Sequence, residues 1–348
     1  MSLLEETAAR VAPLNAQAMD GARARQDRLT KPQGALGRLE DLSIHLAGIT
    51  GNIARSFEER AVLVMAADHG VAARGVSAYP QEVTAQMVAN FLRGGAAINV
   101  LARQMGARVV VVDIGVAADL GPQKGLVTRK VRAGTRDFVQ EPALTPEEIR
   151  QAMETGIALA NEVAPDLLAL GEMGIGNTTA ASAVVAAITG EPAERVTGRG
   201  TGIDDVTWLR KIAVVEKALA LHKPDPKSAF SVLGAVGGLE IAGLAGAAIA
   251  AAARRVPVVL DGFISTAAAM AAVTLCPPLR DYLIAGHRSV EPGHAVALKW
   301  LGLRPLLELD LRLGEGTGAI LAFPIIEAAV RTLREMTTFD EAGVSGPS

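Results

Sequence analysis

The chain has 348 residues, half of them hydrophobic but only 3% aromatic, which suits helices packed closely against a parallel sheet. Its formal net charge of −3 argues against nucleic acid as a partner, and its single cysteine, Cys276, excludes an intrachain disulfide. One cysteine and the lack of a signal-like apolar run in residues 2–25 favour a reducing, cytoplasmic compartment. The most lipid-like stretch, residues 241–253, is about two-thirds of the length that a membrane span needs, so no span is predicted.

Short valine-rich runs alternate along the chain with longer segments of helical spacing. This alternation predicts an α/β fold with a doubly wound, mainly parallel sheet flanked by helices. The predicted strands are residues 61–67, 109–114, 167–170, 257–260, 281–285 and 306–311. The predicted helices among them are residues 80–104, 146–164, 178–189, 205–222, 237–253, 265–275 and 292–301. The basic stretch 124–136 fits neither pattern and is interpreted as a surface excursion.

Polar residues and glycines gather where the predicted strands end. In strand order they are Asp68-His69-Gly70, Asp113 with Gly115, the loop around Glu172, Asp261-Gly262, residues 286–289, and the loop around Glu315. Open α/β sheets bind ligands outside the carboxyl ends of their strands. The convergence of these segments therefore predicts a ligand site at that edge of the sheet.

Two of these loops combine glycines with a glutamate. The first is GEMGIGNTT (171–179), which leads into a predicted helix whose free N–H groups suit an anion. The second is LGEGTG (313–318), where an adjoining apolar segment would desolvate Glu315 and raise its pKa. Each could be only a tight turn that needs glycine. Together they favour a cleft in which a phosphorylated substrate meets proton chemistry. Neither loop has the dinucleotide-binding or Walker A pattern.

Other candidate groups are less decisive. Residues 197–205 form a third glycine-rich loop, and Lys211 in the helix that follows could reach a phosphate or equally be an exposed lysine. His69, His287 and His294 lack the spacing of metal ligands, so no metal is predicted. A serine-histidine-aspartate triad is not supported either, because no Gly-x-Ser-x-Gly motif is present.

Eight segments, in order along the chain, carry a specific resemblance. They are TKPQGALGRLE (30–40), ADHGV (67–71), GVSAYPQEVT (75–84), GEMGIGNTT (171–179), GRGTG (198–202), DGF (261–263), GHRSVEPGH (286–294) and LGEGTG (313–318). Together they resemble the nicotinate-nucleotide–dimethylbenzimidazole phosphoribosyltransferase family, which makes the lower-ligand nucleotide of cobalamin. The resemblance spans nearly the whole chain. Where some members carry Ser and Gln, this chain has Tyr79 and Met87, which leaves the preferred acceptor base open.

The resemblance implies transfer of 5-phosphoribose from nicotinate mononucleotide to 5,6-dimethylbenzimidazole, without cofactor or metal. It implies that Glu315 is the general base and that Glu172 is a second carboxylate near the reacting centre. It also implies that the substrates are bound by Tyr79, Met87, Gly174, Gly176, Asn177, Thr178, Gly200, Lys211, Asp261, Ser289, Glu291, Arg312 and Leu313.

The resemblance further implies a homodimer whose partners are small-molecule substrates. Each chain is expected to have a Rossmann-like catalytic domain (51–319) and a small helical domain built from residues 1–50 and 320–348. The helical spacing of Leu36, Leu39, Leu42 and Leu46 agrees with the latter.

Two other interpretations stay open from the sequence. One is a different nucleotide-dependent enzyme on a doubly wound sheet, such as a dehydrogenase, against which the missing dinucleotide fingerprint argues. The other is a non-catalytic nucleotide-binding protein, against which two glutamates in ligand-facing loops argue.

Overall fold

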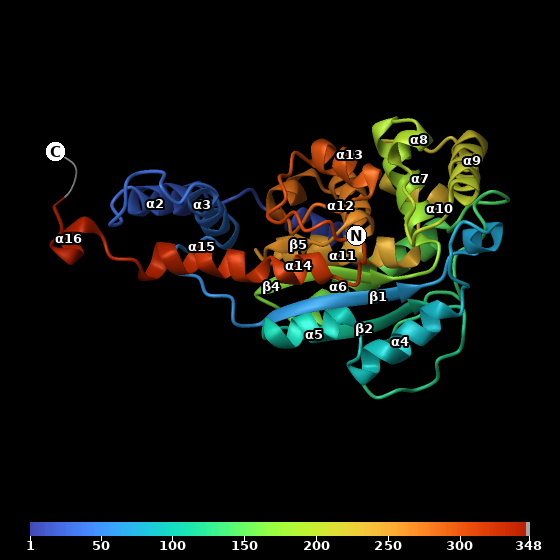
Figure 1. The fold of residues 1–348 in the computed structure, drawn as a ribbon, viewed down its shortest axis with the longest axis horizontal. Coiled ribbons are helices and arrows are strands. Elements are labelled where there is room, and N and C mark those ends of the chain that lie inside the picture. Colours follow the sequence, from blue (N-terminus) through green and yellow to red (C-terminus); the bar gives the residue numbers. More distant parts are fainter. Residues whose placement is uncertain (346–348) are drawn as a thin grey trace.

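A six-stranded, entirely parallel sheet forms the centre of the computed structural model, which describes residues 1–345. Its strands are β1 (Arg60–Ala67), β2 (Arg108–Gly115), β3 (Leu126–Thr128), β4 (Leu167–Met173), β5 (Val258–Leu260) and β6 (Leu283–Ala285). Their spatial order is β3-β2-β1-β4-β5-β6, so the chain winds outward from β1 in one direction and from β4 in the other (Figure 1). The predicted doubly wound α/β class is confirmed.

Two strand predictions were wrong. Residues 306–311 contribute only an isolated bridge between Leu307 and His287, because the chain turns away at Asp310, whose φ is 53°. The sixth strand is β3 instead, within the basic stretch interpreted as a surface excursion. β3 is short and pairs only with β2, at the edge of the sheet, so it lacks the long apolar run that marks a buried strand.

Side chains of β1 alternate between two hydrophobic cores, one on each face of the sheet. Leu63 and Met65 belong to one core, whereas Val62 and Val64 belong to the other. The first core is covered by α6 (Pro146–Val163), α7 (Asn177–Thr189), α10 (Ala229–Val236), α11 (Leu239–Ala253), α12 (Phe263–Leu275) and α13 (Pro292–Leu301). The second is covered by α3 (Arg38–Thr50), α4 (Val83–Arg93), α5 (Ala97–Gln104), α14 (Thr317–Leu321) and α15 (Phe323–Glu335).

Between these elements lie the short helices η1 (Gly70–Arg74), α8 (Ala193–Val196) and η2 (Pro277–Tyr282) and the 18-residue helix α9 (Asp205–His222). The predicted helix over residues 80–104 is two helices, because α4 ends at Gly94, whose φ of 76° an α-helix cannot accommodate. α6 and α11 pack so closely that a Cβ at Gly156 or Gly246 would collide with the backbone of the other helix. The alanine- and glycine-rich composition of α11 is thus a packing requirement.

Three helices stand out at one end of the molecule in Figure 1: α2 (Ala16–Gln26), α3 and α15, followed by α16 (Phe339–Ala342). α3 packs against both α2 and α15, around Ala22, Ala47 and Leu333. α1 (Leu3–Ala9) instead packs against α6 and α11. We propose that α2, α3, α15 and α16 form the core of the small helical domain. Residues 346–348, which were predicted to belong to this domain, lie outside the described part of the chain. No helix within residues 1–345 is long and apolar enough to cross a membrane.

Candidate active site

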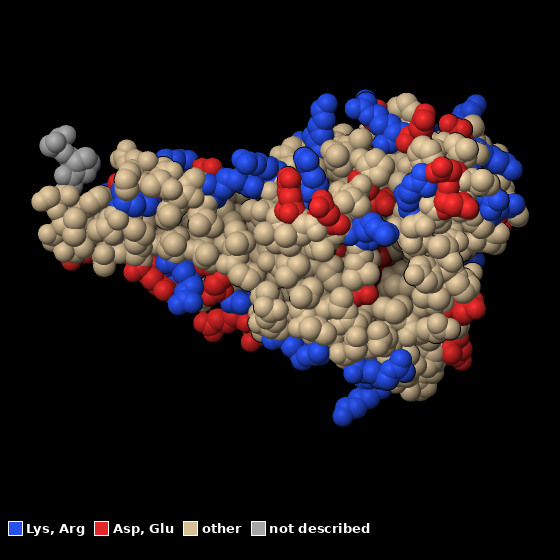
Figure 2. Space-filling view, viewed as in Figure 1, with Lys and Arg blue, Asp and Glu red and all other residues tan. Residues whose placement is uncertain are grey.

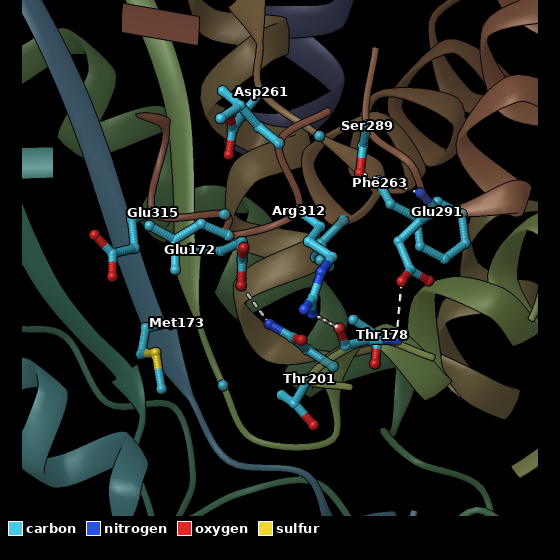
Figure 3. A pocket seen from close by; sticks show the side chains of 18 of the residues that line it. Glu172, Met173, Thr178, Thr201, Asp261, Phe263, Ser289, Glu291, Arg312 and Glu315 are labelled. Atoms are coloured by element: carbon cyan, nitrogen blue, oxygen red, sulfur yellow. Dashed lines mark hydrogen bonds between the residues drawn. The ribbon is translucent and has the colours of Figure 1, made fainter. Parts of the chain in front are cut away.

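A cavity of about 690 Å³ opens at the carboxyl edge of the sheet. Its walls come from the segments that follow β4, β5 and β6, from the loop before α14, and from residues 79–87 and 200–201 (Figure 3). Acidic side chains are visible in a recess of the molecular surface in Figure 2. The predicted site residues that line the cavity are Tyr79, Met87, Glu172, Gly174, Asn177, Thr178, Gly200, Asp261, Ser289, Glu291, Arg312, Leu313 and Glu315.

Gly176 and Lys211, the other predicted site residues, lie just behind the cavity wall. Gly176 is the residue before α7 and has a φ of 95°, which glycine adopts readily. Lys211 is fully buried, and its Nζ donates hydrogen bonds to Thr178 Oγ1 (2.8 Å) and the Gly198 carbonyl (3.2 Å). The alternative of an exposed lysine is therefore wrong. Burial lowers the pKa of Lys211 to about 8, against the opposing effect of the Glu291 charge. Beside the start of α7, its ammonium group suits an anion.

Glu172 is the first of two buried carboxylates in the cavity. It lies on β4 itself, near the strand's end, and is only 6% exposed. Its Oε2 accepts a hydrogen bond from the Asn177 side-chain amide. Burial, followed by the negative charges of Glu240 and Asp261, raises the pKa of Glu172 to about 8. The free protein therefore keeps this side chain mostly protonated at neutral pH.

Glu315 is the second buried carboxylate, and its backbone is unusual. Its φ is 64°, between Gly314 and Gly316 at 90° and 94°, a conformation that costs free energy for a residue with a Cβ. The Glu315 Oε2 accepts a hydrogen bond from the Ile98 N–H (3.2 Å) in the first turn of α5. Burial raises its pKa, and this hydrogen bond opposes the rise. In Figure 3 the Glu315 and Glu172 carboxylates point in different directions.

Asp261 holds the loop that carries Glu315. Its two carboxylate oxygens accept hydrogen bonds from three backbone N–H groups, those of Gly316 (3.1 Å), Gly318 (2.6 Å) and Ala319 (3.2 Å). His287 Nε2 lies 3.4 Å from Asp261 Oδ1. Asp261 was predicted as a substrate-binding residue, and its present contacts make it at least the anchor of this loop.

The far wall of the cavity is held by residues from distant parts of the chain. Glu291 Oε1 accepts a hydrogen bond from the Gly200 N–H (2.8 Å), and an Arg312 guanidinium N–H donates to the Gly200 carbonyl (3.0 Å). The Ser289 N–H donates to His294 Nδ1 (2.9 Å), so this ring carries its proton on Nε2, next to Thr266. Burial lowers the pKa of His294 to about 3, and the neutral ring orients the loop.

Comparisons with known proteins agree with this arrangement. A family described as "Phosphoribosyltransferase" matches residues 11–344. The chain is 64% identical to the nicotinate-nucleotide–dimethylbenzimidazole phosphoribosyltransferase of Chloroflexus aggregans and 62% identical to that of a Roseiflexus species, over 99% of each chain. The solved structure of CobT from Thermus thermophilus superposes with a TM-score of 0.92 at 50% identity, covering 95% of this chain and all of that one. The chain belongs to this phosphoribosyltransferase family.

Several residues of this phosphoribosyltransferase's cavity were not predicted from the sequence. Thr201 and Phe263 line it and stand in segments that the resemblance quoted, so their position beside predicted residues was an available signal. Glu240, whose charge acts on Glu172, gave no such signal because it stands at the start of a helix that reads as wholly apolar. Within residues 1–345, no cluster of three or more His, Cys, Asp or Glu side chains is arranged to hold a metal ion.

The raised pKa of Glu172 has a consequence for stability. An ordinary glutamate has a pKa of 4.5, whereas burial raises that of Glu172 to about 8. Between these values the folded state binds the proton more tightly than the unfolded state, so the free energy of unfolding falls as pH rises. We expect Glu172→Gln to remove a decline on the order of a few kcal/mol between pH 5 and 8, measured by urea unfolding. Glu216→Gln, on the exposed face of α9, is the control and should keep the wild-type decline. Equal slopes in all three proteins would contradict the prediction.

Proposed function

We propose that this chain transfers 5-phosphoribose from nicotinate mononucleotide to 5,6-dimethylbenzimidazole, giving α-ribazole 5′-phosphate and nicotinate. The observation that carries the proposal is the pairing, in one cavity, of two buried carboxylates with an anion site formed by the start of α7 and Lys211. The names of relatives that are 53–64% identical over the whole chain support the same reaction. The product is the lower-ligand nucleotide of cobalamin.

The donor's phosphate fits the positively charged end of the cavity. Backbone N–H groups around Gly174 to Asn177 face the start of α7, where the helix dipole favours a negative charge. Lys211 adds a full positive charge behind Thr178, and Ser289 lies across the cavity. These groups would fix one end of the nucleotide and so place its ribose C1′ near the carboxylates.

Bond breaking at C1′ needs little help from an acid. The bond from C1′ to the pyridinium nitrogen breaks, and its electron pair leaves with nicotinate, which departs with a neutral ring nitrogen. Positive charge then develops on the ribose. An ionised carboxylate beside it stabilises that charge more strongly in the transition state than in the ground state. Attack from the opposite side converts the β-linkage into an α-linkage.

The acceptor must lose a proton as it attacks. One benzimidazole nitrogen forms the new bond to C1′, and the N–H proton of the other passes to a carboxylate. A general base works best when its pKa is close to the working pH, and burial raises the pKa of both Glu172 and Glu315. Glu172 holds its proton at neutral pH in the free protein, which favours Glu315 as the base. The cationic donor would promote ionisation of Glu172, which then stabilises the ribosyl cation.

The proposal is tested by mixing purified protein with both substrates and EDTA and identifying products by mass spectrometry. We expect α-ribazole 5′-phosphate and nicotinate in equal amounts, because each transfer releases one nicotinate. We expect EDTA not to prevent the reaction, because a pyridinium leaving group needs no Lewis acid. No product from either dimethylbenzimidazole or unsubstituted benzimidazole would contradict the transfer. Oxidation of a reduced nicotinamide nucleotide would instead support the dehydrogenase interpretation.

The two carboxylates should respond differently to loss of charge. Glu315→Gln keeps size but cannot accept a proton, so we expect kcat to fall about 10²–10⁴-fold while nicotinate mononucleotide binding, measured by calorimetry, stays close to wild type. Glu172→Gln should lower kcat less. Glu58→Gln, at an exposed position outside the cavity, serves as the control. A larger loss for Glu172→Gln than for Glu315→Gln would reverse the two roles.

We also propose that the chain works as a homodimer in the cytoplasm. Large apolar side chains are exposed beside the cavity, including Tyr79 (54%), Leu313 (58%) and Leu309 (53%). Such side chains gathered on one face are typical of an interaction surface. One chain has a mass of 36.0 kDa, and light scattering at micromolar concentration should give twice that mass. A mass of a single chain across that range would contradict the dimer.

A further inference from the structure

A further buried acid, Glu240, is paired with a histidine that the reaction above does not use. His69 Nε2 and Glu240 Oε1 are 2.6 Å apart, and both side chains are 0% exposed. His69 follows β1, whereas Glu240 lies in the first turn of α11. Burying a charged carboxylate is costly unless it makes compensating interactions. An isolated acid–histidine contact of this kind therefore has to be held in place by the fold around it.

The histidine ring is packed against the loop that follows Glu172. A Cβ on Gly174 would lie 3.4 Å from His69 Cδ2 and Nε2, and one on Gly176 would lie 3.4 Å from His69 Cβ. On its other side, a Cβ on Gly238 would collide with the ring. The ring thus fills the space between the Glu172 loop and the start of α11, and glycines on both sides allow that approach.

The hydrogen-bonding pattern indicates which ring nitrogen carries the proton. Among residues 1–345, neither His69 Nδ1 nor Glu240 Oε2 has a hydrogen-bond partner. An unpaired, buried Nδ1–H is more costly than an unpaired acceptor nitrogen, so the proton shared with Glu240 belongs on Nε2. The Nε2–H group then donates to Glu240 Oε1.

We propose that His69 and Glu240 are positioning residues for the transfer reaction: the His69 ring supports the loop that follows Glu172, and Glu240 holds that ring in place from the start of α11. The charged and titratable groups around Glu172 are Glu240 on α11, Asp261 after β5 and Glu315 before α14, with His69 after β1. Of the three carboxylates, Asp261 and Glu315 are engaged with backbone N–H groups of other loops. Glu240 is the one that is hydrogen-bonded to a side chain, His69, that packs on the Glu172 loop.

The electrostatic effect of Glu240 on Glu172 has a definite sign. After burial, the Glu240 charge is the largest cause that raises the pKa of Glu172. Removing this charge should lower the pKa of Glu172 and let it ionise at lower pH. Replacing His69 with glutamine leaves the Glu240 charge and supplies an amide N–H donor, while it removes the ring from behind Gly174. The two substitutions therefore separate the charge effect from the packing effect.

The test compares Glu240→Gln with His69→Gln in the full chain. For Glu240→Gln, we expect the acidic limb of the kcat profile to move to lower pH by on the order of one unit, with the decline in unfolding free energy moving the same way. For His69→Gln, we expect both profiles to keep their wild-type position while kcat falls several-fold. An unchanged kcat in His69→Gln would overturn the proposal, and unmoved profiles in Glu240→Gln, or an equal shift in His69→Gln, would overturn the effect of Glu240 on Glu172.

A double variant and the stability profile separate the proposal from the proposed function. Should Glu240→Gln fail to fold, the double variant His69→Leu/Glu240→Met removes both polar partners together, which leaves no unpaired buried group and should show the same shift to lower pH. The kinetic consequence rests on the proposed function, but the stability profile does not. A shift in unfolding without any transfer activity in wild type would refute the proposed function and leave the effect of Glu240 on Glu172 standing. An unmoved stability profile in the double variant would refute that effect.

Discussion

The site depends first on the carboxylate of Asp261. This side chain, at the end of β5, accepts hydrogen bonds from three backbone N–H groups of the loop that contains Glu315. Hydrogen bonds to an ionised acceptor are stronger than neutral ones, and three of them compensate for the burial of the charge. They also hold Glu315 at a φ of 64°, a conformation that a free loop would leave. Without this anchor, the second carboxylate of the cavity would have no fixed position relative to the first.

The sheet brings like charges together that would otherwise repel one another. Parallel strands all end at the same edge, so residues distant in sequence meet there: Glu172 on β4, Asp261 after β5 and Glu315 before α14. Desolvation and repulsion from neighbouring carboxylates make the ionisation of Glu172 and Glu315 unfavourable in the free protein. A substrate with a positively charged ring relieves that repulsion when it binds. This is the basis of our proposal that the cavity binds a cation next to the carboxylates and an anion next to Lys211.

The sequence was sufficient for the parts of this arrangement that depend on local patterns. Buried strands of a parallel sheet are continuous apolar runs, which is why residues 61–67 and 109–114 were predicted almost to the residue. Residues 306–311 (LLELDL) are interrupted by two acids, and they form only an isolated bridge at Leu307 before the left-handed residue Asp310. β3 was not predicted because a short strand at the edge of the sheet needs no continuous apolar run. Lys211 was ambiguous because burial of a lysine depends on which helix face packs inward.

The least predictable feature is the burial of Glu240. It stands in an apolar segment, but an acid at a helix start is also typical of an exposed position, because the helix dipole favours a negative charge there. Only the fold places that first turn at the carboxyl ends of β1 and β2, next to His69 and away from water. The same glutamate at an exposed helix start would be screened by solvent and would act weakly on its surroundings. Burial removes that screening, which is why we propose that packing around the start of α11 influences the ionisation of Glu172.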